Sequence, residues 1–560
     1  MKATGRMSFK KMIQIPMMIS LSSGLLYLGQ KAYGESGNWE ICLSESDLSC
    51  AIDIRKKRGV DIPKAKEELE NLSKSDLELL SGTLFHEGKY QQLELVLDAL
   101  SYPENTPDEE PPLRATIDAS IGLYESRSPD GLVRVRHGGG VEWILVDDAI
   151  ETLVASKKSF QKIFGGIPNH PLVMDIYPTA KQFISASGIP EKAVRTTGVI
   201  ALSKWTRLLL TSPRAMSSGY GWKDTASHEY IHLVVAWRSK DKAPVWLQEG
   251  LAKYFEQDWK DELGHQDIHK TFYLSHRQQS QLAQAIKEDS FVPFEKFRYS
   301  MAYLDSSEEA SLAYAQVSSM IHFLDKKAGR DAFPKLMDRV AQGEDPMMSV
   351  AKLAGYKSFD AFRKGWIGFI RTLPLIEKEL AEIPISLDGL GGDFGDDPLL
   401  SQRKDLAKFV RVGDLLFDKG YIEAALVEYN KAQSGFEAST EEDIQPSPIL
   451  YARQSICYLR LKDPTTALKI IKQGHEKAPE HPQILRAYGE ILQSVNKDKE
   501  AILYWSTAND VDPYDIKTQK ALTELYQKIG KEELAQKHQR YVRILSGEQS
   551  KNINTTLLWE

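Results

Sequence analysis

Cysteine is scarce in this chain, with three residues in 560. Cys42 and Cys50 are the only pair that stand close in sequence, so the cysteines offer one short disulfide loop and no thiolate cage for a structural zinc ion. Such a loop is typical of an oxidising compartment. Cys457 lies in an apolar helical segment and is expected to be a buried thiol.

A dominant charge of one sign is also absent. The 71 Lys and Arg residues nearly balance 78 Asp and Glu, which gives a formal net charge of −7. No basic patch with interleaved aromatic residues stands out, which argues against nucleic acid or an anionic membrane as the main partner. A phosphate loop is not indicated either, because neither Gly-x-Gly-x-x-Gly nor Gly-Lys-Ser follows the glycines at 138–140. Those glycines instead predict a hairpin turn.

Long apolar runs are missing except near the N-terminus. Residues 12–28 are apolar or small, but Pro16 and several serines make them a weak membrane-spanning segment. Four basic residues precede them, and Ala32-Tyr33-Gly34 offers a small-x-small cleavage site, so residues 1–34 are predicted to be an export signal. We therefore expect a periplasmic, cell-envelope or secreted protein, attached to the membrane only if the signal stays uncleaved. No cysteine follows the cleavage site, which argues against a lipoprotein.

The remaining length is enough for three or four folded domains, with 42% hydrophobic residues to fill their cores. Residues 35–125 are predicted to be a helical region that contains one helical hairpin with its turn at Gly88. Residues 126–380 are predicted to begin with strands over 132–136, 143–146 and 172–177, with a helix over 149–164, and to continue with helices over 224–375. Residues 381–403, Gly- and Asp-rich over 387–398, predict a linker rather than a calcium loop, because EF-hand spacing is absent.

Residues 404–545 carry an internal repeat. Ala467, Ala501 and Ala535 stand 34 residues apart, and Pro479 and Pro513 close successive units at the same period. A 34-residue period with small residues at helix crossings is the tetratricopeptide pattern. Four such units would stack into a concave surface for a peptide or protein partner. Because repeats contact mainly their neighbours, the array is expected to be separable from the preceding domain, with residues 546–560 as a tail.

The most informative motif is His228-Glu229-x-x-His232, which is followed by Trp246-Leu247-Gln248-Glu249-Gly250. Residues four apart share a helix face, so both imidazoles can bind one metal ion, and Glu229 can reach a water on that ion. A catalytic zinc needs three protein ligands and an open position, and Glu249 is well placed to be the third. The zinc would lower the pKa of its water, and Glu229 would take the proton as a general base. Apolar neighbours favour this interpretation over a solvated helix face.

These motifs resemble those of the gluzincin clan of metallopeptidases, and in particular the bacterial peptidase-MA-like domains. The Trp-Leu-x-Glu-Gly-x-Ala helix is shared with zinc aminopeptidases. The resemblance covers residues 125–375 and implies an α+β, thermolysin-like fold with a mixed-sheet and a helical subdomain, followed here by an all-α solenoid. It also implies one Zn²⁺ per chain on His228, His232 and Glu249. Only 16 residues separate His232 from Glu249, a couple fewer than in aminopeptidases. Glu256, seven residues further on, is the nearest rival for the third ligand.

The resemblance extends to a candidate oxyanion donor and a candidate substrate strand. By likeness to the aminopeptidases, Tyr314 would donate its hydroxyl to the developing oxyanion, with a core aromatic as the alternative. His322 is expected to be packed or partly exposed rather than part of a site. Residues 197–202 are expected to form an edge strand that binds extended peptide through Gly198, Val199 and Ala201. No Gly-x-Met-Glu-Asn motif is present to grip a substrate N-terminus, so endopeptidase action is favoured.

Two functions from different classes remain open at this point. The first is an exported zinc peptidase whose repeats recruit a protein substrate or an envelope partner. The second is a tetratricopeptide scaffold with a peptidase-like domain that binds envelope proteins without cleaving them. All four residues of the motifs are present: His228, Glu229, His232 and Glu249. This favours the first function, because a domain that no longer catalyses a reaction does not need all four.

Overall fold

The computed structural model describes residues 39, 42, 47–100, 113–189, 191, 194, 199–204, 206–216, 218–264, 271–298, 301, 304–377, 403–438, 447–548 and 556–557. The export signal expected over 1–34, Gly198 of the expected edge strand, and the 387–398 segment lie outside these residues. Among the described residues, no helix combines the length and the hydropathy needed to cross a membrane.

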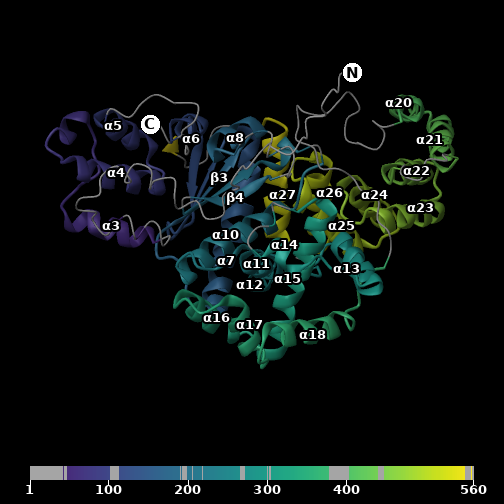
Figure 1. The fold of residues 1–560 in the computed structure, drawn as a ribbon. Coiled ribbons are helices and arrows are strands. Elements are labelled where there is room, and N and C mark those ends of the chain that lie inside the picture. The colour runs from purple at the N-terminus through teal and green to yellow at the C-terminus, as the bar shows by residue number, and fades with distance from the viewer. Residues whose placement is uncertain are drawn as a thin grey trace, which may run out of the picture.

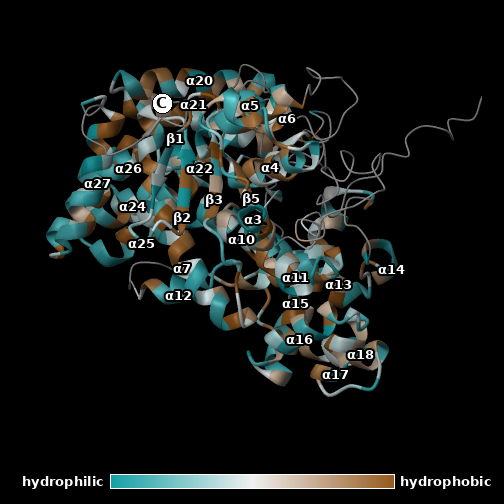
Figure 2. Cartoon of the chain, turned by 90° about the vertical axis from the view of Figure 1, so that its left-hand side faces the viewer, coloured by the Kyte–Doolittle hydropathy of each residue, from teal (hydrophilic) through white to brown (hydrophobic). Residues whose placement is uncertain are grey.

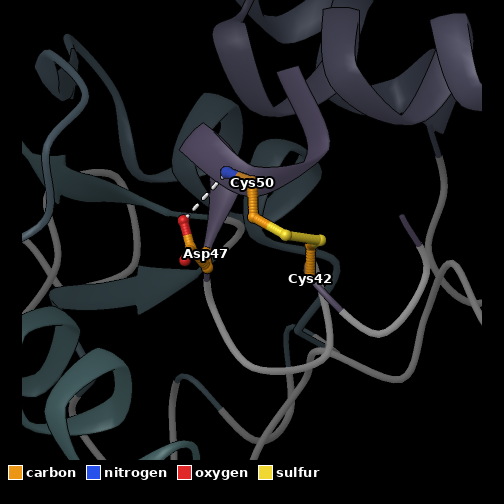
Figure 3. The surroundings of a disulfide bond; sticks show 3 residues. All are labelled: Cys42, Asp47 and Cys50. Atoms are coloured by element: carbon orange, nitrogen blue, oxygen red, sulfur yellow. Dashed lines mark hydrogen bonds between the residues drawn. A yellow bond between two sulfur atoms is a disulfide. The ribbon is translucent and has the colours of Figure 1, made fainter. Parts of the chain in front are cut away.

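The N-terminal part is helical, as expected, and begins with a disulfide. Its elements are α3 (Leu48–Lys57), η1 (Lys66–Leu69), α4 (Lys74–Glu87), α5 (Tyr90–Ala99) and α6 (Leu113–Ser120). Cys42 and Cys50 are bonded, with their Cα atoms 5.6 Å apart, and Asp47 accepts a hydrogen bond from the Cys50 N–H as the N-cap of α3 (Figure 3). The expected turn between α4 and α5 is confirmed at Gly88, which ends α4 in the left-handed conformation.

A mixed six-stranded sheet follows in the order β4-β5-β3-β2-β1-β6. Its strands are β1 (Tyr124–Arg127), β2 (Val133–His137), β3 (Leu172–Tyr177), β4 (Ala201–Lys204), β5 (Arg207–Thr211) and β6 (Thr556–Leu557). β2, β3 and β5 are parallel, while β1, β4 and β6 pair antiparallel with their neighbours. The strands predicted over 132–136 and 172–177 are thereby confirmed as β2 and β3.

The prediction of a strand over 143–146 and of a hairpin turn at 138–140 was wrong. Gly138 and Gly139 precede η2 (Gly140–Leu145), and residues 143–146 lie in η2 and at the start of α7 (Val146–Phe164). The physical reason is the parallel pairing of β2 with β3, which requires a crossover connection instead of a hairpin. α7 is that crossover, and the apolar run Trp143-Ile144-Leu145-Val146 is the entry into it.

Helices dominate from residue 222 to residue 370, as predicted. They are preceded by α8 (Ala180–Ser187) and η3 (Pro213–Ala215). The helices are α10 (Trp222–Ser239), α11 (Val245–Phe255), α12 (Trp259–Leu263), α13 (His276–Glu288), α14 (Phe294–Phe297), α15 (Ser307–Ala328), α16 (Ala332–Ala341), α17 (Pro346–Leu353) and α18 (Phe359–Ile370). One hydrophobic core joins α7, β3 and β5 to α10, α11 and α15. In Figure 1 this central part lies between the purple helices α3–α5 and the green helices α20–α23.

Four helix pairs occupy residues 404–545, where the repeat predicted them. They are α20 (Lys404–Asp418) with α21 (Ile422–Glu437), α22 (Ile449–Arg460) with α23 (Pro464–Lys477), α24 (Pro482–Ser494) with α25 (Asp498–Val511), and α26 (Ile516–Lys528) with α27 (Glu532–Leu545). Ala467, Ala501 and Ala535 are fully buried, and a Cβ on Gly489 would meet the Trp505 ring at 2.9 Å. The small residues therefore do lie where helices approach closely. These helices carry both hydrophobic and hydrophilic segments (Figure 2).

The last helices of this array pack against the central part of the molecule. Lys537 of α27 pairs with the buried carboxylate of Asp148 in α7 at 2.5 Å. Tyr541 and Ile544, also in α27, belong to the same hydrophobic core as α7 and α10. The expectation that the array is separable does not agree with these contacts, because removing α27 would uncover apolar surface and take the Lys537 cation away from buried Asp148. The 34-residue period describes contacts within the array and carries no information on this docking.

Candidate metal centre

The helix α10 brings His228 and His232 to one side of the helix. Their ring centroids are 4.9 Å apart, as expected for residues one turn apart. The helix is anchored on its other side by Ile231, Val234 and Val235, all fully buried. Both imidazoles are therefore held at the surface of a packed helix while keeping some exposure, 17% for His228 and 13% for His232.

Glu249 of α11 completes a three-residue cluster. Its Oε2 atom lies 3.4 Å from Nε2 of His228 and 3.6 Å from Nε2 of His232. One ligand atom from each of these residues lies within 4.8 Å of the other two. The structure thus brings together all three residues that the sequence predicted as ligands. Two imidazole nitrogens and a carboxylate oxygen also fit the donor chemistry of a catalytic zinc site.

The neighbouring Gly250 explains how α11 comes to this position. A Cβ at Gly250 would lie 3.0 Å from the carbonyl oxygen of Val317 and 3.0 Å from the Ile321 side chain, both in α15. Only a residue without a side chain allows α11 and α15 to approach this closely. The Glu-Gly pair in the motif therefore combines a carboxylate toward α10 with a close helix contact toward α15.

Glu256 takes a different place from the one considered for it as a rival ligand. Its Oε2 atom lies 3.0 Å from Nδ1 of His228, on the opposite side of the ring from the nitrogen that faces Glu249. Lys253 donates to the other Glu256 oxygen at 2.5 Å. A carboxylate on the second ring nitrogen fixes the orientation of a metal-binding histidine and raises its basicity. The sequence showed the three-residue spacing of Lys253 and Glu256, but not that the pair faces His228.

The electrostatics of the cluster follow from burial and from the mutual contacts. Burial alone would lower the pKa of His228, but the hydrogen bonds to Glu249 and Glu256 raise it to about 10. Burial also acts to raise the pKa of Glu249, yet the two imidazoles outweigh it and hold that pKa below the ordinary value. Glu229 has a raised pKa, because its burial outweighs the effect of His232 and His228. A bound cation would replace the proton on His228.

Tyr314 and His322 stand on α15 in different environments. The charge of Glu249, with burial and the charge of Glu229, raises the pKa of the half-buried Tyr314 well above its ordinary value. The carboxylates of Glu249 and Glu229 therefore both act electrostatically on the Tyr314 hydroxyl. His322 instead contacts Tyr273, whose hydroxyl is 3.1 Å from its Nδ1, and stacks on Tyr254. His322 is packed in an aromatic cluster, in agreement with the expectation of a packed or partly exposed histidine.

The expected edge strand lies beside Glu229, but it begins later than predicted. β4 starts at Ala201 and forms one edge of the sheet, while Val199 precedes it outside any strand. The backbone of Ser203 in β4 lies near the Glu229 carboxylate and acts to lower its pKa. This proximity could not be predicted from the sequence, because a backbone N–H can come from any residue type. It brings the edge of β4 next to α10.

Comparison with known proteins gives little beyond this geometry. A family model described as a protein of unknown function (DUF1570) matches residues 223–347, a stretch that contains His228, Glu229, His232, Glu249 and Tyr314. No curated protein matches the chain.

Among solved structures, native yeast LTA4 hydrolase is similar over 75% of this chain and 66% of that chain, at 10% identity and a TM-score of 0.28. A MamA RS-1 ArsTM double mutant is similar over 27% of this chain and 82% of that chain, at 18% identity and a TM-score of 0.22. Similarity at this level carries no inference about activity.

Proposed function

We propose that this chain is a zinc-dependent metallopeptidase that cleaves peptide bonds within polypeptides. The observation that carries the proposal is the convergence of His228, His232 and Glu249 within 4.8 Å, with Glu229 next to the first histidine. This donor set is that of a catalytic zinc site with an open position. A zinc ion bound there would supply Lewis-acid chemistry, by polarising a carbonyl and lowering the pKa of a water.

Glu229 is the general base in this proposal. Its side chain is nearly buried beside the backbone of Ser203, and burial raises its pKa. From this position it takes the proton of the attacking water and delivers it to the departing amine. Glu256 and Lys253 do not bind the metal in this proposal. Glu256, paired with Lys253, contacts Nδ1 of His228 and so orients the ring with Nε2 toward Glu249.

The substrate is proposed to lie along the β4 side of the centre. An extended peptide can pair with the free edge of a sheet, and β4 has a hydrogen-bonded neighbour on one side only among the described strands. Ala201, the first residue of β4, and the preceding residues Val199 and Gly198 are proposed to contribute to this binding. Because backbone pairing does not require a free N-terminus, it supports cleavage within a chain.

We also propose that the protein is exported and that the helical array recruits a protein substrate or partner. The bond between Cys42 and Cys50 supports an oxidising compartment such as the periplasm or the cell envelope. The stacked helix pairs support partner binding, since arrays of this kind present extended surfaces. A peptidase-like scaffold that binds such partners without cleaving them is the alternative that experiment must separate.

Removal and return of zinc test the proposed function directly. We expect the full chain to cleave internal bonds in a library of unstructured peptides, to lose this activity when a chelator removes the metal, and to regain it with one equivalent of Zn²⁺. Mass spectrometry of the products identifies the cleaved bonds. A zinc-loaded protein that leaves every peptide intact would favour the scaffold instead.

Replacement of Tyr314 by Phe is expected to slow catalysis without loosening the metal. Loss of one oxyanion donor typically costs about 10²–10³ in kcat. The measurement is kcat for a cleaved peptide, with zinc content determined on the same sample. A kcat close to that of the wild type would show that Tyr314 only packs on α15 and has no role in the proposed mechanism.

A further inference from the structure

The connection between β5 and α10, residues 212–221, is held by the helical array. The N–H of Tyr220 donates to the carbonyl oxygen of Val511, the last residue of α25, at 3.0 Å. A Cβ on Gly219 would lie 2.2 Å from that same oxygen, so the two backbones touch at a point where no side chain fits. The contact therefore comes two residues before α10 begins at Trp222.

A second contact fixes the start of the same connection. The hydroxyl of Tyr514, in the turn between α25 and α26, donates to the Glu142 carboxylate at 2.7 Å and lies 2.9 Å from the Ser212 hydroxyl. Glu142 is fully buried, and the side chains of Ser212 and Arg214 also contact its carboxylate. Tyr514 thus ties η2 and the residue that follows β5 to the array.

A third contact involves the first turn of α10 itself. Lys223 pairs with Asp510 of α25 at 2.5 Å, and its side chain is only 14% exposed. A cation at the N-terminus of a helix is unfavourable, because that end carries the positive part of the helix dipole. Asp510 offsets this cost. Lys223 stands five residues before His228, so the ion pair acts within two turns of the candidate ligands.

We propose that the end of α25 and the turn that follows it position α10, the helix of His228 and His232, with Tyr514 as the positioning residue. Asp510, Val511 and Tyr514 come from one short segment of the array, and together they hold both ends of residues 212–221 and the first turn of α10. The array is then part of the scaffold of the centre as well as a surface for partners. The effect on catalysis rests on the proposed function, while the effect on α10 does not.

Hydrogen exchange of the full chain tests this inference with Tyr514→Phe. The substitution removes a hydroxyl bonded to a buried charge, an interaction of the stronger kind, and leaves the ring in place. We expect amides of residues 218–227 to exchange about tenfold faster, with α4 and α20 unchanged. In the peptide assay, kcat should fall by a similar factor at unchanged KM and zinc content.

Tyr429→Phe is the matched control, because it removes a tyrosine hydroxyl bonded to Asp414 at 2.6 Å in the first helix pair. In this variant, the exchange rates of residues 218–227 and kcat should both equal those of the wild type. Asp510→Asn is a second variant, which weakens the ion pair between Asp510 and Lys223. It should also speed the exchange of residues 218–227. Wild-type exchange over 218–227 in both Tyr514→Phe and Asp510→Asn, or an equal increase in all helices, would overturn the inference. If the wild type cleaves no peptide, the proposed function fails while the exchange result still decides the role of Tyr514.

Discussion

Replacing Glu229 with Gln is expected to abolish most peptide cleavage while zinc stays bound. The amide keeps the size of the side chain, but it cannot accept the proton of the attacking water. Loss of a general base typically costs about 10²–10⁴ in rate, which makes this the largest catalytic effect expected for a single atom change at the centre. His228, His232 and Glu249 are untouched, so zinc content should remain that of the wild type.

The position of Glu229 supports a specific effect rather than a loss of structure. The Ser203 backbone acts on its carboxylate, and a Gln side-chain oxygen is an acceptor of the same size at that position. The helix α10 is anchored by fully buried apolar residues that the substitution does not reach. The variant should therefore keep its fold and unfold at a temperature close to that of the wild type.

The second large effect is expected from Arg136→Ala, which acts on stability. Arg136 is 1% exposed and lies 3.1 Å from Glu125 and 3.4 Å from Asp175, both buried carboxylates. Its guanidinium also donates to the carbonyl oxygen of Gly88 at 3.1 Å, at the end of α4. Removing one partner of a buried ion pair costs about 3–5 kcal/mol. Without Arg136, the buried carboxylates keep Arg207, 3.6 Å from Asp175, and the exposed Arg127 beside Glu125.

The loss should be local to the contact between the sheet and the helical hairpin α4–α5. Hydrogen exchange of α4 and α5 amides measures it, since a chain of several domains has no single free energy of unfolding. Arg127→Ala is the matched control, because Arg127 also pairs with Glu125, at 2.7 Å, but is 61% exposed. A change no larger in Arg136→Ala than in Arg127→Ala would show that the buried network does not hold the hairpin.

The sequence predicted those parts of the candidate centre that depend on spacing along one helix. His228 and His232 follow from the four-residue period, and Glu249 follows from the second motif. Glu256 could not be placed from sequence, because its side of His228 depends on how α11 crosses α10. The Ser203 contact and the Val511 and Tyr514 contacts could not be predicted either, since each joins backbone or side-chain atoms of segments far apart in the chain.

The same distinction holds for the fold. The turn at Gly88 and the helical nature of the segment around Glu249 were predicted correctly from apolar periodicity and from the motif. The run at 143–146 was assigned to a strand because a short apolar run looks alike in a buried strand and in a buried helix. Only the parallel pairing of β2 and β3, a tertiary feature, decides between the two.

The most direct test of the central claim is the rate of peptide-bond cleavage per bound zinc, measured in parallel for the wild type and for Glu229→Gln. The zinc-peptidase account predicts one zinc per chain in both proteins, cleavage by the wild type, and a rate about 10²–10⁴ lower in the variant. Equal rates in the two proteins, or a wild type that binds zinc and cleaves nothing, would contradict it.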